Sequence, residues 1–129
     1  MRKKILMLVL IMVSCVVVLP VSCGINDKQA IVSTVTNFYD AYQNREYSRC
    51  IEYLSDRLRN STGDRNVISS LQTGRLWSGF VKLNNIGDPK ITGKTARVWV
   101  DIEILLGLVK SSEISLIKEG IRWKIDNIQ

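Results

Sequence analysis

The sequence predicts an α+β domain in which N-terminal helices are followed by an antiparallel sheet. Apolar residues recur at helical spacing between residues 31 and 58. From residue 80 onward the period changes to two, and apolar and polar residues alternate from Ala96 to Leu105. Short turns separate these later segments, so we expect neighbouring strands to run antiparallel. One face of the sheet is then apolar and needs the helices to cover it.

An apolar signal or anchor segment precedes this domain. Arg2, Lys3 and Lys4 are followed by an uncharged run over residues 5–22, which is the layout of a secretory signal. The basic residues stay on the cytoplasmic side of the membrane, so the rest of the chain is exported. We therefore divide the chain into a lipoprotein signal peptide at 1–22, an anchor linker at 23–26 and a domain at 27–129.

Cys23 is the residue that we predict to carry lipid. Residues 19–22 resemble the bacterial lipobox, in which a small residue precedes the lipid-bearing cysteine, although Pro20 departs from that pattern. Residues 11–15 fit the pattern better locally, but cleavage before Cys15 would leave an exposed apolar tail. An uncleaved transmembrane anchor of roughly 27 Å and ordinary cleavage after Cys23 stay open as alternatives. The prediction places the domain on the extracytoplasmic face of the cell membrane, with the N-terminal lipid as its contact.

The charge and the residue types exclude several functions. Without the three basic residues of the signal, 15 of the 18 basic residues remain against 12 acidic ones, a net charge of +3. That charge is spread along the chain, which argues against nucleic acid as a partner. The chain has no histidine, and with Cys23 lipidated Cys50 is the remaining thiol. We therefore expect no internal disulfide, no metal and no cofactor, and we expect Cys50 to be a small core residue.

Three helices are expected in the first part of the domain. The first begins at the capping residue Asn26 and carries an apolar stripe made of Ile31, Val35, Phe38 and Tyr42. The second carries a stripe from Tyr47 to Leu58 and ends in the polar loop that follows. The third contains Val67 and closes near Gly74.

Four strands are expected after these helices. The first covers Phe80–Leu83, and the second is the alternating segment that begins at Ala96. The last two are Lys110–Lys118 and Ile121–Asp126, joined by a hairpin turn at Gly120. Trp123 alternates with charged residues in the last strand, on the same face as its apolar neighbours two positions away. We therefore predict that Trp123 and Ile121 both face the core.

Three short sequences stand out along these elements: Phe38-Tyr39-Asp40-Ala41-Tyr42, Ala96-Arg97-Val98 and Trp123-Lys124-Ile125-Asp126. In this order of elements they resemble the nuclear transport factor 2-like superfamily, and more closely its small bacterial lipoproteins of undefined role. The resemblance covers about residues 27 to 128. It implies a strongly curved antiparallel sheet wrapped around the helices as a cone, with a pocket at the wide end. Members include ketosteroid isomerases, dehydratases, polyketide cyclases and binding modules, so the fold does not fix the function.

The superfamily's enzymes suggest which groups would have to act in catalysis. They commonly use an Asp–His pair, which a chain without histidine excludes, or Tyr and Asp groups held in an apolar pocket. The candidates for a Tyr/Asp site are Tyr39, Tyr42, Asp40 and Asp56. Tyr42 lies on the core stripe, whereas Asp40 lies on a different face of the same helix. We expect no two of the four to converge on one point of a cavity, and we assign no catalytic residue.

Five residues are predicted to line the pocket or the core: Phe38, Tyr42, Trp77, Val100 and Trp123. Trp77 could rim the pocket, but we favour a place in the core. Asp101 and Glu103 share a strand face with Arg97, which favours a solvated polar surface over a cation site. Trp99 lies on that polar face and is predicted to mark a protein interface, such as a homodimer through the sheet, unless a loop covers it.

These observations predict a membrane-anchored, non-enzymatic binding module for a small apolar ligand or an envelope partner. One alternative is a small isomerase- or dehydratase-like enzyme that uses Tyr and Asp. The other is an interaction module of an envelope assembly, with Trp99 in the contact. Convergent acids or phenols in a sizeable pocket favour the enzyme. A filled core with an exposed apolar patch on the sheet favours the interaction module.

Overall fold

The computed structural model describes residues 23–79 and 81–129. The signal segment 1–22, which includes Cys15, and Phe80 lie outside the described residues. In the described part of the chain, no helix combines the length and the apolar character that crossing a membrane requires.

The described residues form four helices before the sheet: α2 (Cys23–Gln43), α3 (Tyr47–Ile51), α4 (Asp56–Thr62) and α5 (Asp64–Ser78). Helix α2 begins at Cys23, three residues before the predicted cap at Asn26, so the residues predicted as a linker are helical backbone. The apolar stripe of α2 is buried as its period predicts, with Ile31, Val35 and Phe38 almost fully covered.

An extended segment at Leu54–Ser55 divides the predicted second helix into α3 and α4. The Oγ of Ser55 caps α4 by accepting a hydrogen bond from the backbone N–H of Leu58 at 3.1 Å. The backbone N–H of Ser55 donates to the carbonyl oxygen of Ile125 at 2.8 Å, and Leu54 forms a parallel bridge with the same residue. Pairing with the last strand therefore interrupts a segment whose apolar residues keep helical spacing.

Helix α5 continues to Ser78, four residues beyond the glycine where we expected it to close. Gly74 lies inside the helix, and a Cβ atom there would be only 2.9 Å from the hydroxyl oxygen of Tyr42. Because the helix continues, Trp77 lies on its last turn and is 84% exposed. The prediction that Trp77 fills the core is therefore wrong.

Five strands form one antiparallel sheet in the described chain: β1 (Lys82–Ile86), β2 (Lys90–Thr92), β3 (Thr95–Ile104), β4 (Leu108–Glu119) and β5 (Arg122–Ile128). The order is β1-β3-β4-β5, and the short β2, which we did not predict, pairs with the other half of the β3 edge that β1 uses. A short 3-10 helix, η2 (Leu105–Gly107), joins β3 to β4.

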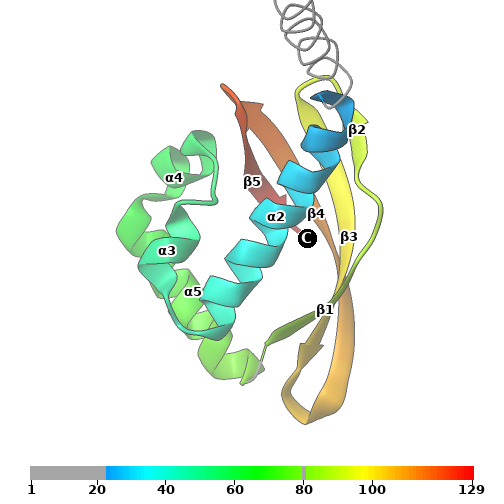
Figure 1. Cartoon of the computed structure of the whole chain (residues 1–129). Coiled ribbons are helices and arrows are strands. Elements are labelled where there is room, and N and C mark those ends of the chain that lie inside the picture. The colour runs from blue at the N-terminus through cyan, green and yellow to red at the C-terminus, as the bar shows by residue number, and fades with distance from the viewer. Residues whose placement is uncertain (1–22, 80) are drawn as a thin grey trace, which may run out of the picture.

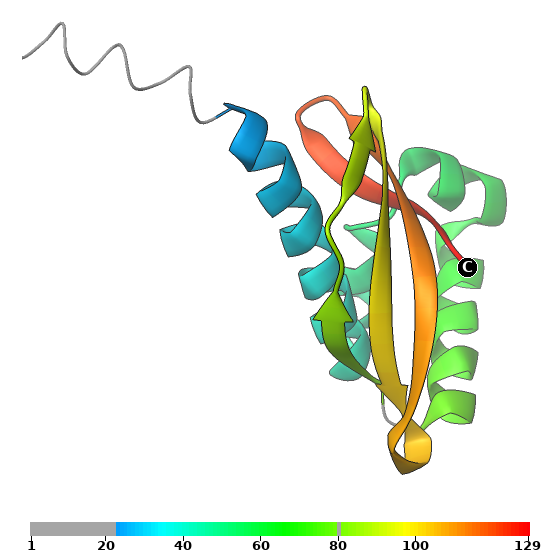
Figure 2. The same ribbon diagram turned by 90° about the vertical axis from the view of Figure 1, so that its right-hand side faces the viewer.

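All four helices lie on one side of this sheet (Figures 1 and 2). The alternation along β3 turns Val98 and Val100 toward the helices, and both are buried. Strand β4 is in phase, because Ile114 lies opposite Val98 and is also fully buried. The last turn of α5 and η2 lie at the same end of the molecule, away from the first turn of α2 (Figure 1). We call this the distal end.

Trp123 connects the last strand to the first helix. It is 2% exposed, as its strand phase predicts. Its indole Nε1 donates to Asp27 on α2 at 3.0 Å, and the same carboxylate accepts from the Nζ of Lys118 at 3.0 Å. These two hydrogen bonds lower the pKa of Asp27 below its usual value. The carbonyl oxygen of Trp123 also accepts from the hydroxyl of Thr34 at 3.1 Å.

Ile121 does not share the position of Trp123 in the core. Gly120 adopts a positive φ of 62°, and β5 begins only at Arg122. Ile121 therefore belongs to the turn and is 89% exposed. The prediction that Ile121 continues the buried face of the last strand is wrong, because the strand begins one residue later.

Candidate functional site

A cavity of about 200 Å³ lies at the distal end, between α2, α5 and the inner face of the sheet. Most of its lining is apolar or aromatic: Phe38, Tyr39, Tyr42, Leu71, Val81, Ile102, Ile104 and Ile128. The polar lining consists of Ser78, Lys110 and Ser112. Apolar walls with a few convergent polar groups are typical of small-molecule sites.

Helix α2 supplies the three aromatic rings of the cavity. Phe38 and Tyr42 are one helical turn apart, and their rings stack with centroids 6.1 Å apart. The ring of Tyr39 meets that of Phe38 edge-on at 5.3 Å. Both geometries are favourable for aromatic pairs, so this side of the cavity is a packed wall.

Strands β3 and β4 supply the opposite wall. Lys110 lies opposite Ile102, and Ser112 lies opposite Val100, so both face the same side as the core residues of β3. Ser112 is buried, whereas Lys110 is exposed to solvent. A hydroxyl therefore lies inside the apolar wall, and Lys110 is the one charged side chain in the described lining.

Burial keeps the two phenols of the cavity protonated. Desolvation raises the pKa of Tyr39 far above its usual value, and the nearby Tyr42 adds to the shift. Desolvation also raises the pKa of Tyr42. Both hydroxyls are therefore neutral at physiological pH and can donate a hydrogen bond to an acceptor in the cavity.

The four candidates for a Tyr/Asp site are only partly brought together. Tyr39 and Tyr42 line the same cavity, and the expectation that no two of the four converge on one point of it stays a prediction. Both belong to the lining because α2 turns a face wider than one stripe toward the sheet. Asp40 faces solvent 3.8 Å from Arg49, and Asp56 is exposed at the start of α4. The described lining of the cavity therefore contains two phenols and no carboxylate.

The residues predicted to line the pocket or the core have three different locations. Phe38 and Tyr42 line the cavity. Val100 and Trp123 are buried in the core outside the cavity lining. Trp77 is on the surface at the distal end.

Sequence reasoning missed two polar residues of the cavity, Lys110 and Ser112. The signal was present, because Ile114 and Leu116 already define the inner face of this strand. Extending their period of two toward the N-terminus places Ser112 and then Lys110 on the same face.

The outer face of the sheet is a solvated polar surface, as predicted. Asp101 accepts a hydrogen bond from Ser111 at 2.6 Å, and Arg97 lies 4.0 Å from Glu113. Trp99 protrudes from this face and is 57% exposed. Its role in an interface, or in a homodimer through the sheet, stays a prediction.

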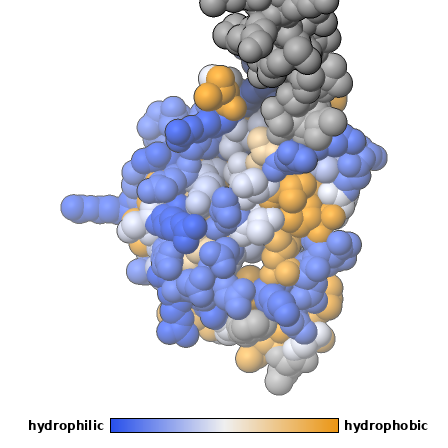
Figure 3. Space-filling model, viewed as in Figure 1, coloured by the Kyte–Doolittle hydropathy of each residue, from blue (hydrophilic) through white to orange (hydrophobic). Residues whose placement is uncertain are grey.

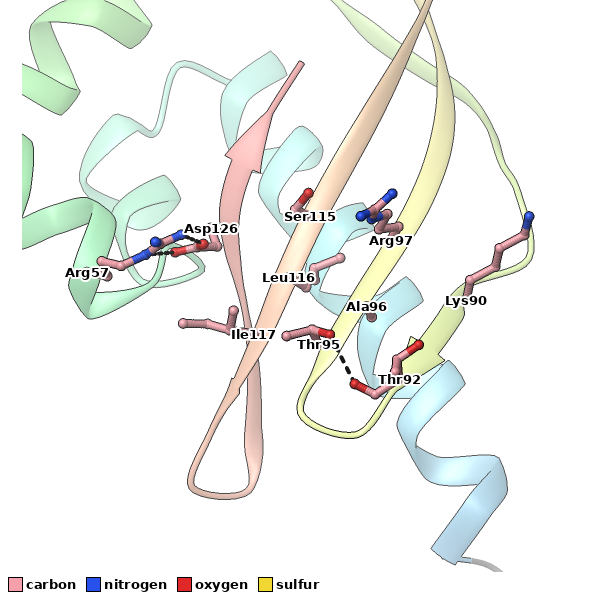
Figure 4. Close-up of a pocket in the computed structure, with 10 residues that line it drawn as sticks. All are labelled: Arg57, Lys90, Thr92, Thr95, Ala96, Arg97, Ser115, Leu116, Ile117 and Asp126. Atoms are coloured by element: carbon pink, nitrogen blue, oxygen red, sulfur yellow. Dashed lines mark hydrogen bonds and ion pairs between the residues drawn. The ribbon is translucent and has the colours of Figure 1, made fainter.

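A larger hollow of about 710 Å³ lies on this outer face, between β2 and α4 (Figure 4). Arg57 and Asp126 border it on one side, and Lys90 borders it on the other. The carboxylate of Asp126 already accepts hydrogen bonds from the Oγ of Ser55 at 2.7 Å and from the Nε of Arg57 at 3.1 Å. The carboxylate of Asp126 in this hollow is already hydrogen-bonded within the fold. We therefore place the candidate site in the apolar cavity.

Cys50 is a core residue, as predicted. It is fully buried, and burial raises the pKa of its thiol to about 11. A thiol with such a pKa is a poor nucleophile near neutral pH. Within the described ranges, no three His, Cys, Asp or Glu side chains are grouped so that they could hold a metal ion.

Comparison with known proteins identifies the fold. No protein-family model and no curated protein matches the sequence. A proposed dehydratase of the NTF2-like family from Streptomyces avermitilis covers 81% of this chain and 94% of its own, at 14% identity and a TM-score of 0.66. A proposed NTF2-like transpeptidase from Campylobacter jejuni covers 72% of this chain and 94% of its own, at 19% identity and a TM-score of 0.53. The chain has the nuclear transport factor 2-like fold.

The helices packed on an open antiparallel sheet agree with the cone of the nuclear transport factor 2-like fold. The cavity lies between the helices and one end of the sheet, and the pocket that the resemblance implies at the wide end of the cone stays a prediction. At these identities the likeness concerns the fold alone. The activities named for the two similar proteins are therefore not carried over to this chain.

Proposed function

We propose that the chain is a membrane-anchored, extracytoplasmic binding module whose cavity holds a small apolar molecule with an acidic or hydrogen-bond-accepting head. The lining of the cavity carries the proposal: aliphatic and aromatic side chains surround the neutral hydroxyls of Tyr39, Tyr42 and Ser112. The apolar body of a ligand gains free energy by leaving water. Its head accepts the hydrogen bonds that these hydroxyls can donate.

The volume of the cavity limits the size of the ligand. An engineered apolar cavity of about 150 Å³ in another protein takes up benzene, and the cavity here has about 200 Å³. We therefore expect a ligand of about one aromatic ring with a short substituent. A steroid is too large for a cavity of this volume.

Positive charge near the cavity favours a negative head on the ligand. Lys110 belongs to the lining, and its flexible stem allows the ammonium group to follow a bound ligand. Arg75 lies close enough to Tyr42 for its charge to favour the phenolate, although burial has the larger influence on that pKa. The Nε of Arg75 is buried without a hydrogen-bond partner in the described chain.

Catalysis by Tyr and Asp is the second candidate function. The presence of both Tyr39 and Tyr42 in the lining of one cavity favours it, and one similar structure is a proposed dehydratase. A general acid or base near neutral pH needs a group with a matched pKa. Burial keeps both phenols neutral, and Asp40 and Asp56 lie outside the lining. Binding therefore has the stronger support.

Fluorine NMR of the full-length chain in lipid nanodiscs tests the binding function, with 4-fluorobenzoate as the probe. We expect the wild-type chain to broaden or shift the probe resonance relative to empty nanodiscs. Ser112→Leu places a larger apolar side chain in the cavity and should weaken binding about tenfold or more, because the ring can then bury less of its apolar surface. Equal binding by the wild type and Ser112→Leu would contradict the proposal.

Ser111→Leu is the matched control, because Ser111 is the next residue of β4 and faces the outer side of the sheet. This variant should bind the probe like the wild type. Lys110→Met should abolish the preference for 4-fluorobenzoate over uncharged 4-fluorobenzyl alcohol. Binding of the alcohol itself should persist in Lys110→Met, because the apolar lining is unchanged.

The anchor is tested by metabolic labelling with a fatty-acid analogue. The basic and apolar pattern of residues 1–22 and the position of Cys23 support it. We expect Cys23→Ala to abolish the label and to leave unprocessed precursor, because the acceptor thiol is lost. Cys15→Ala should keep the label. Labelling that survives Cys23→Ala but disappears in Cys15→Ala would move the anchor to Cys15.

A further inference from the structure

Exposed apolar side chains gather at the distal end. Leu76 and Trp77 come from the last turn of α5, and Leu105, Leu108 and Val109 come from η2 and the start of β4. We call these five residues the distal rim. They are five of the eight large apolar side chains exposed in the described part, so they form a concentration and are not scattered singly. Hydrophobic surface is visible at this end of the molecule in Figure 3.

The two parts of the distal rim meet next to segments that line the cavity. A Cβ atom on Gly79 would lie 3.0 Å from the Cδ1 of Leu105, so Leu105 packs against the backbone that follows α5. Ser78, Ile104 and Lys110 are each next to a rim residue in the sequence, and all three line the cavity. The distal rim is therefore continuous in the chain with three residues of the cavity lining.

We propose that the distal rim docks on a lipid bilayer that contains anionic headgroups. No polar side chain occurs from Ile104 to Val109, so this turn can enter the interface without burying a charge. Trp77, which is 84% exposed, is of the residue type enriched at membrane interfaces. Exposed apolar residues flanked by basic ones are typical of surfaces that lie at the headgroup boundary.

The positive charge beside the distal rim favours an anionic bilayer over a second copy of the chain as the surface that docks there. Glu103 lies opposite Lys82 on the neighbouring strand, which leaves the exposed Lys110 and the half-buried Arg75, next to Leu76, as net positive charge beside the rim. In a symmetric pair the same surface of two copies meets, so the two Lys110 side chains would be brought together. Anionic lipids are complementary to this charge, and each basic residue near such a surface strengthens binding about fivefold.

The position of the distal rim determines what docking would do. The rim lies at the opposite end of the domain from the first turn of α2 (Figures 1 and 2). A chain held by its N-terminus therefore either presents the rim to a second bilayer or tilts it toward its own. In both cases the distal end of the domain, where the cavity lies, faces lipid. The docking proposal does not depend on what the cavity binds.

Quenching of tryptophan fluorescence by brominated lipids tests the docking. The full-length chain carries Trp99→Phe, so that Trp77 is the exposed tryptophan and Trp123 is buried. It is reconstituted in vesicles of phosphatidylcholine with phosphatidylglycerol, and acceptor vesicles of the same composition are added. In one arm of the experiment, the vesicles that carry the reconstituted chain contain the brominated acyl chains. In the other arm, the added acceptor vesicles contain them. We expect quenching in at least one arm, weaker when phosphatidylglycerol is omitted.

Leu108→Glu should lower the vesicle affinity measured by quenching about tenfold or more, since burial of one leucine side chain accounts for at least that factor. The matched control is Ile121→Glu, because Ile121 is also an exposed apolar turn residue but lies in the β4–β5 turn. It should quench like the parent. Absence of quenching in both arms overturns the proposal. So does a Leu108-dependent dimer in sedimentation without quenching, which would assign the rim to a second copy.

Discussion

Trp123→Ala is expected to lower the free energy of unfolding by about 3–5 kcal/mol, the range for deleting a large buried aromatic side chain. The indole is 2% exposed, and its loss removes the hydrogen bond that ties β5 to Asp27 on α2. A domain of this size has only about 5–15 kcal/mol of stability, so the loss of this one side chain removes a large share of it.

Denaturant melts of the full-length chain measure the effect. Trp99→Ala is the matched control, because Trp99 lies on the same sheet but is 57% exposed on the outer face. It should change the free energy of unfolding by less than about 1 kcal/mol. A change of that small size for Trp123→Ala would show that the assigned strand phase is wrong.

Asp126→Ala is expected to cost about 1–3 kcal/mol of stability at pH 7. Ser55 is fully buried, and its hydroxyl donates to Asp126 while its oxygen caps α4. Without the carboxylate this buried hydroxyl loses its acceptor. The partner guanidinium of Arg57 is 75% exposed, so solvent screening reduces the share of the ion pair.

The same carboxylate makes stability depend on pH in the acid range. The hydrogen bond from Arg57, with a smaller one from Ser55, holds the pKa of Asp126 below its usual 3.8. A lowered pKa contributes stability that is present above the unfolded value and is lost as pH falls through the folded value. Urea melts should therefore show a smaller loss of stability between pH 7 and pH 3 for Asp126→Asn than for the wild type.

Asp88→Asn is the control for this pH dependence, because Asp88 is exposed and, among the described residues, forms its ion pair with the exposed Lys28. Its acid-range loss should equal that of the wild type. If Asp126→Asn also matches the wild type, the carboxylate of Asp126 does not contribute to folding in the way that we describe.

The sequence predicted those parts of the fold that depend on local periodicity. The alternation along β3 placed Val98 and Val100 correctly on the inner face, and the stripe of α2 placed Phe38 in the core. Both patterns report which face of an element is buried, and burial supplies most of the folding free energy.

The errors arose where a contact distant in the sequence outweighs a local preference. Ser55 leaves the helical pattern because it pairs with Ile125 and contacts Asp126, about 70 residues away along the chain. A glycine inside a helix costs about 1 kcal/mol, yet Gly74 is retained where a Cβ would crowd the hydroxyl of Tyr42. Neither contact has a signature in the nearby sequence.

The candidate site was predictable only in part for the same reason. Phe38 and Tyr42 follow from the helix period, and Ser112 from the strand period. The space between them depends on how α5 is placed over the sheet, which no local pattern specifies. The exposure of Trp77 had the same cause, since it required knowing that α5 continues past Gly74.

Native mass spectrometry of the full-length chain, released from the membranes of the cells that produce it, tests the binding function most directly. We predict a bound species heavier than the polypeptide by the mass of a small molecule, about that of one substituted ring. The adduct should be absent from Ser112→Leu and present in Ser111→Leu. Identical spectra without an adduct for the wild type and Ser112→Leu, together with unchanged fluorine NMR of the probe, would contradict a ligand-binding cavity.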